Sequence, residues 1–181
     1  MAFNYDSTDV PESMDGFDFP KPGEYHFQVN RSEMDDKDQL VIEAEVLAGN
    51  PPDQEGKVHK EWFNAPTPEQ TPEKRRGTLK RQLAFFIAVG LTSEEELITA
   101  KKAGKGISID EGLAVGRQFC GRLTAETYEG KTRNKLGFDM WPVNSQKAAS
   151  IPLNKGMLEK NGEKKAVPAG GDVFGGDDDP F

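Results

Sequence analysis

The sequence has one cysteine, two histidines and no hydrophobic run long enough to span a bilayer. A single cysteine, Cys120, excludes an internal disulfide and is typical of a reducing compartment. His26 and His59 match no zinc-binding spacing, so we expect neither a metal nor a cofactor. The first twenty residues contain no lysine or arginine, which is atypical of a signal peptide. These absences favour a cytoplasmic protein that is not an enzyme.

Acidic residues outnumber basic ones, and the formal net charge is −8. Most of this excess lies at the two ends, because residues 1–20 contain five acids and residues 148–181 contain six acids against four lysines. The centre is therefore nearly neutral and holds two basic clusters. One comprises Lys74, Arg75, Arg76, Lys80 and Arg81, and the other Arg117, Arg122, Lys131, Arg133 and Lys135. A local groove can attract phosphate although the whole chain is an anion.

The composition predicts one folded domain with disordered ends. An apolar content of 35% with 30% charged residues is low for a compact globule of this length. We expect an acidic, partly disordered leader over residues 1–20, one domain over residues 21–147 and a flexible tail over residues 148–181. The tail has no sustained periodicity and contains Gly170-Gly171 and three prolines.

Alternating apolar residues predict three strands before any helix, over residues 24–34, 40–46 and 57–64. A helix follows, because apolar and small residues recur at helical spacing. They are Leu79, Leu83, Phe86, Ile87 and Gly90. Thr92 and Ser93 then predict a capping box for a second, short helix.

Strand-like alternation returns at Arg117, and a hairpin loop over residues 129–134 leads into a last strand that ends near Met140. The resulting order is β-β-β-α-β-β, an all-β fold with an inserted helix. This order predicts a five-stranded OB-fold barrel. An SH3-like barrel and an open α+β sandwich would give a similar pattern.

The body of the chain resembles a family of single-stranded-DNA-binding proteins of bacteriophages and prophages. The resemblance covers roughly residues 23–143 and lies in Gly23-Glu24-Tyr25, residues 41–49, Trp62-Phe63-Asn64 and the helix over residues 79–91. It implies an OB-fold that binds single strands.

A protein that binds single-stranded nucleic acid needs aromatic and basic side chains, since bases stack on aromatic rings and cations follow the phosphates. In an OB-fold, the groove crosses the middle strands between the first and last hairpin loops. Trp62 and Phe63 point to opposite faces, so one of them belongs to the core. The candidate residues are Trp62, Phe63, Arg122, Tyr128, Lys131, Arg133, Lys135 and Trp141.

The chain ends in a glycine-flanked acidic run closed by an aromatic residue: Asp177, Asp178, Asp179, Pro180 and Phe181. This tip resembles that of bacterial single-stranded-DNA-binding proteins, although the aliphatic residue usual before the proline is absent. The resemblance implies recruitment of replication, recombination and repair proteins. The alternative is that the acidic tip only increases solubility, a role to which an exposed phenylalanine contributes nothing. The tip can also compete with DNA for a basic groove.

We therefore expect a protein that coats single-stranded DNA without strong sequence preference in a bacterial or phage-infected cell. The alternative is a scaffold or DNA-mimic decoy that binds a nucleic-acid enzyme but not nucleic acid. A carboxylate-based nuclease is a third possibility. The preference for DNA over RNA and the oligomeric state, a homo-oligomer included, stay open.

Overall fold

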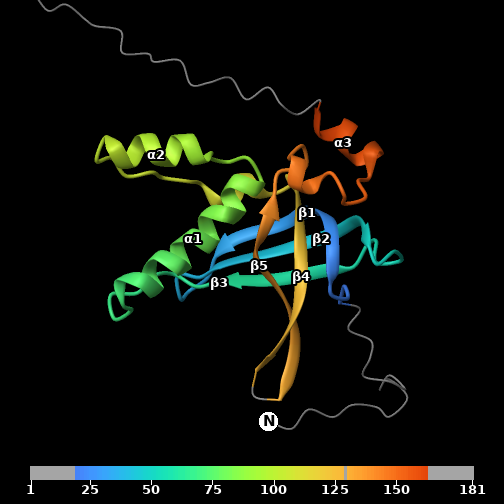
Figure 1. Ribbon diagram of the computed structural model, residues 1–181, viewed down its shortest axis with the longest axis horizontal. Helices are drawn as coiled ribbons and strands as arrows, with labels where there is room; N and C mark the ends of the chain where they lie inside the picture. The colour runs from blue at the N-terminus through green and yellow to red at the C-terminus, as the bar shows by residue number, and fades with distance from the viewer. Residues whose placement is uncertain (1–18, 129, 163–181) are drawn as a thin grey trace, which may run out of the picture.

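The computed structural model describes residues 19–128 and 130–162. Five antiparallel strands form one sheet in the order β3-β2-β1-β4-β5. Two helices connect β3 to β4, and a third follows β5 (Figure 1). The predicted order of three strands, a helical segment and two strands is confirmed. The elements are β1 (Gly23–Met34), β2 (Leu40–Asn50), β3 (Val58–Phe63), α1 (Pro72–Ala88), α2 (Glu94–Lys102), β4 (Gln118–Tyr128), β5 (Lys131–Trp141) and α3 (Lys155–Gly162).

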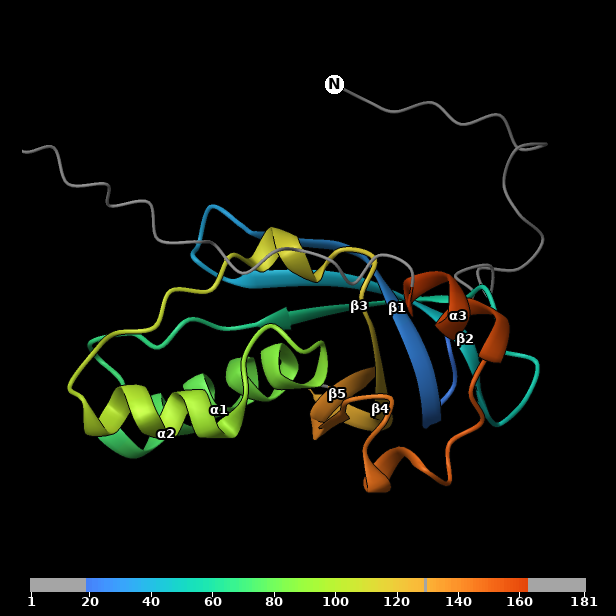
Figure 2. The ribbon, with the colours of Figure 1, turned by 90° about the horizontal axis from the view of Figure 1, so that it is seen from above.

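Helices α1 and α2 extend to one side of the sheet, whereas α3 lies over β1 and β2 at the other side (Figures 1 and 2). Thr71 caps the start of α1, and Ser93 and Glu96 form the predicted capping box of α2. Among the described residues, no helix is long and apolar enough to cross a membrane.

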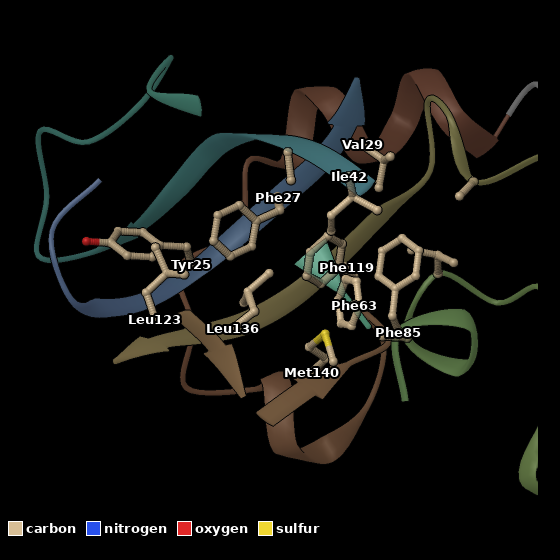
Figure 3. Packing of buried hydrophobic residues seen from close by; sticks show 14 of the residues in the cluster. Tyr25, Phe27, Val29, Ile42, Phe63, Phe85, Phe119, Leu123, Leu136 and Met140 are labelled. Carbon is tan, nitrogen blue, oxygen red and sulfur yellow. The ribbon is translucent and has the colours of Figure 1, made fainter. Parts of the chain in front are cut away.

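Aromatic rings from the sheet and from α1 form the main core (Figure 3). Phe27 of β1 stacks on Phe119 of β4, with ring centroids 5.1 Å apart. Phe85 of α1 meets Phe119 edge-on and also packs on Phe63 of β3. The alternation that predicted the strands therefore follows the burial of the face that packs on this main core.

Close packing requires glycine at two positions, Gly23 and Gly49, in the segments that carry the family resemblance. A Cβ at Gly49 would lie 2.1 Å from the ring of Tyr25, and a Cβ at Gly23 would lie 2.3 Å from the carbonyl oxygen of Asn50. Only glycine allows such an approach. These residues of the motif therefore serve the packing of β1 on β2.

The sheet does not close into the predicted barrel. Among the described residues, no backbone ladder joins β3 to β5; side chains span the seam between these strands instead. Arg81 of α1 donates from Nε to the carbonyl oxygen of Leu136 at 3.1 Å and from Nη1 to that of Trp62 at 3.1 Å. Glu61 of β3 accepts from the Leu136 N–H at 2.6 Å. The two strands are thus joined through Glu61 and Arg81, which take the hydrogen bonds that a closed barrel would make between backbones.

Packing continues beyond the predicted domain boundary at residue 147. Ala148 and Ile151 are buried against Cys120 on the face of the sheet away from the main core. The buried ring of His26 accepts from the N–H of Asn154 at its Nδ1 and bonds Gln118 through its Nε2. Residues 148–154 therefore pack on the sheet, beyond the boundary at which the tail was predicted to begin.

Of three further predicted segments, the hairpin loop differs in length from the prediction, and the leader and the tail lie wholly or partly outside the described residues. The hairpin loop expected over residues 129–134 is shorter, because β4 and β5 pair as far as Tyr128 and Lys131. The leader up to residue 18 and the tail from residue 163, with the acidic tip, lie outside the described residues.

Candidate nucleic-acid interface

The structure distinguishes Trp62 from Phe63. Trp62 points outward and is 45% exposed, whereas Phe63 is 1% exposed in the core. The prediction that Phe63 can stack on a base is therefore wrong, because its ring is covered by Phe85 and by the Arg81 guanidinium, 4.6 Å from its centroid. Trp62 stays a candidate, and Lys60 lies 5.3 Å over its ring.

Trp141 belongs to the second cluster of packed residues. It lies at the end of β5 and packs against Cys120, Ala148 and Ile151. A ring held there covers the sheet under residues 148–151, so it is poorly placed to stack on a base.

Arg122 is exposed but paired. Its Nε donates to Glu24 at 3.0 Å, and its Nη1 lies 3.5 Å from Asp139. Two carboxylates beside one guanidinium leave this part of the sheet locally acidic, which disfavours phosphate.

The cations of the hairpin lie in β5 and not in a loop. Arg133 and Lys135 both reach Glu126 of β4, each at 3.0 Å. Lys135 and Arg133 together lower the pKa of Glu126, so that this carboxylate is ionised at neutral pH. The side chains of Lys131 and Tyr128 lie outside the described part of the structure.

The outer face of β1, β2 and β3 carries paired charges. Arg31 bonds Glu33 and lies 3.2 Å from Glu43, which also pairs with Lys60 at 3.3 Å. Asn30 donates to Glu45 on the same face. With more acids than bases, this face lacks the positive field that the predicted groove across the middle strands would need.

The first half of α1 carries the exposed positive charge instead. Among the described residues, none of its four exposed cations forms an ion pair. They are Lys74, Arg75, Arg76 and Lys80. The only acid of the first turn is Glu73. Cations at a helix start oppose the helix dipole, so this placement costs stability unless an anion is bound.

Arg81, the fifth member of this basic cluster, is largely buried. Its Nη2 lies 2.9 Å from Glu61, whose other oxygen lies 3.2 Å from His59 Nε2. Burial alone would raise the pKa of Glu61, but the His59 hydrogen bond, the charge of Arg81 and the Leu136 N–H together lower it. This carboxylate is therefore a structural anion at the seam.

A groove of about 520 Å³ opens between α1 and the β4–β5 hairpin, beside the cationic turns of the helix. Its walls include Gly77 and Thr78 of α1, Thr124 and Glu126 of β4, and Gly137 and Phe138 of β5. Phe138 is 54% exposed. The sequence analysis did not find this groove; the exposed cations and a glycine inside the helix were the available signals for it.

No protein-family model and no curated protein matches the chain.

Proposed function

We propose that the chain binds single-stranded DNA without strong sequence preference and has no catalytic activity. The observation that carries the proposal is the row of unpaired cations on α1, next to a groove with an exposed aromatic ring. Cations that follow a phosphate backbone, combined with rings that accept bases, are the usual elements of sequence-tolerant single-strand binding.

The strand order supports an OB-like fold for this function. The order β3-β2-β1-β4-β5, with a helix between β3 and β4, is that of an OB-fold opened between its third and fifth strands. The site we propose differs from the usual one: the outer face of the middle strands is neutralised by its own carboxylates, and the cations lie on the helix.

The second part of the proposal concerns partners. The tip formed by residues 177–181 combines three aspartates with a terminal phenylalanine, a combination suited to a basic, apolar pocket on another protein. We propose that it recruits replication, recombination or repair proteins to the bound strand.

The alternative function, a scaffold or DNA-mimic decoy, is supported by one observation. The net charge of −8 and the acids on the outer face of the sheet resemble a polyanion more than a polyanion binder. A decoy would bind a nucleic-acid enzyme and leave DNA free.

Titration of labelled oligo-dT and of duplex DNA at two salt concentrations separates the two functions. We expect the full chain to shift oligo-dT, to bind duplex DNA more weakly, and to lose affinity as salt rises, because bound phosphates release counterions. Tryptophan emission should change on binding where the strand reaches Trp62, whose ring is exposed. No change in emission or mobility at low salt would reject DNA binding in favour of the decoy.

A further inference from the structure

The groove between α1 and the β4–β5 hairpin has features that the fold does not require. Its volume of about 520 Å³ lies within the range of sites that take small organic ligands. It lies next to the seam, where Arg81 forms part of its wall.

Two glycines line the groove. Gly77 lies inside α1 and Gly137 lies inside β5, and a Cβ at either position would meet nothing within 4 Å. Neither residue has a positive φ, so neither backbone strain nor packing requires glycine there. Glycine weakens the interior of a helix and of a strand. The open space beside both glycines leaves room for a flat group between helix and hairpin.

A bulge directs an aromatic ring into this space. Gly121 pairs with Met140 and Leu123 pairs with Leu136, so residues 137–139 of β5 form a bulge opposite β4. Bulges redirect side chains and occur often beside binding sites. Phe138 sits in the bulge, lines the groove and is exposed, whereas Leu136 and Met140 are buried.

The polar lining combines one carboxylate with two cations that are already paired. Glu126 holds Lys135 at 3.0 Å and Glu61 holds Arg81 at 2.9 Å, so neither lining cation is free for a phosphate. Glu126 Oε1 accepts only from Lys135 among the described residues, and its remaining lone pair can accept from an N–H group of a base. Lys74 lies one helical turn before Thr78 on the same side of α1. A phosphate bound by Lys74 would therefore place the adjoining base at the mouth of the groove.

We propose that this groove receives one unpaired nucleobase of the bound strand, stacked on Phe138. The proposal rests on the proposed function, and it assigns the groove a role distinct from that of the α1 cations. The cations hold the backbone of any strand, whereas the groove requires a base.

The test compares two ligands and two pairs of variants in the full chain. The ligands are oligo-dT and an abasic strand of equal length, measured by fluorescence anisotropy. Gly77→Leu fills the groove and also favours the helix, so a loss of binding cannot come from a weakened α1. Gly106→Leu is its control, since Gly106 has equal space and lies outside the groove. Phe138→Ala removes the ring, with Leu113→Ala as the control at another exposed apolar residue.

Stacking of one base predicts that Gly77→Leu and Phe138→Ala each lower the affinity ratio of oligo-dT to the abasic strand by about 5- to 150-fold. Both variants should bind the abasic strand as the unmodified chain does, and both controls should keep the original ratio. An unchanged ratio in Gly77→Leu and Phe138→Ala would overturn the base site and leave single-strand binding intact. Failure of the unmodified chain to bind either strand would overturn the proposed function and the base site together.

Discussion

Helix α1 uses its positive residues in two ways within three turns. Arg81 faces the sheet, where it bonds the backbones of β3 and β5 and pairs with the buried carboxylate of Glu61. Lys74, Arg75, Arg76 and Lys80 face solvent, and none of them pairs with an acid among the described residues. In the sequence these five residues form one basic cluster, but the structure separates a structural cation from four that are available to a ligand.

On the outer face of the sheet, by contrast, the cations are paired with carboxylates. Arg31 and Lys60 also reach the surface, but Glu43 lies within 3.3 Å of both. Exposed pairs of this kind contribute little to stability, and they cancel the field that would attract a phosphate. The number of cations in a region is therefore a poor guide to anion binding unless their partners are known.

Removal of Arg81 should produce the largest effect. Arg81→Ala leaves the carboxylate of Glu61 buried without its cation and removes the hydrogen bonds from Arg81 to two carbonyl groups. Breaking a buried pair from one side costs about 3–5 kcal/mol. Urea denaturation should show this loss in the free energy of unfolding. Lys80→Ala, one residue away and exposed, should change it by no more than about 0.5 kcal/mol. Equal midpoints for the two variants would show that the seam does not hold the domain together.

The same ion pair predicts a dependence of stability on pH. The pKa of Glu61 is lower in the folded state than its ordinary value of about 4.3. Its contribution is therefore fully present above that value and is lost as the pH falls through the folded pKa. In Arg81→Ala the stability curve should fall less steeply below about pH 5, because the charge of Arg81 is one cause of the lowered pKa.

Replacement of the four exposed cations should abolish most DNA binding while leaving the fold intact. In a variant with Gln at Lys74, Arg75, Arg76 and Lys80, the slope of log affinity against log salt should become shallower by about 3, since single strands give roughly 0.7 per phosphate contact. At 0.1 M salt this corresponds to a loss on the order of 100-fold. The matched control is Arg31→Gln with Lys60→Gln, whose cations are already paired. Equal losses in both variants would mean that pairing does not decide which cations bind.

The strand order, the two helices and the alternating core were predictable from the sequence because they follow local patterns. Tyr25, Phe27 and Val29 alternate with polar residues, and the capping box of α2 lies within four residues. The seam was not predictable, because Glu61 and Arg81 meet Leu136 across 55 or more residues. The Arg122–Glu24 pair escaped prediction for the same reason, since 98 residues separate the two. The pairs of Arg133 and Lys135 with Glu126 span only seven and nine residues, but they depend on the register of the hairpin, for which a longer loop was predicted.

Truncation of the acidic tip tests whether the cations of α1 are shielded in the free protein. If residues 177–181 compete with DNA for these cations, their removal should raise affinity for single strands by about threefold to tenfold at low salt, and less as salt screens the charges. Phe181→Ala is the control that keeps the three aspartates and should leave DNA affinity nearly unchanged. An affinity that does not respond to truncation at any salt concentration would reject this shielding.

The smallest effect concerns the hairpin, where one acid holds two cations. In Glu126→Gln, Arg133 and Lys135 lose their carboxylate partner but keep their positions on β5. If pairing is what keeps them from DNA, the variant should bind oligo-dT about fivefold more tightly at 0.1 M salt, with a salt slope steeper by about 0.7 for one added phosphate contact. Addition of Arg133→Gln and Lys135→Gln to the variant should remove this gain. A gain that survives their removal would show that loss of the negative charge beside the groove, and not release of the two cations, increases the affinity.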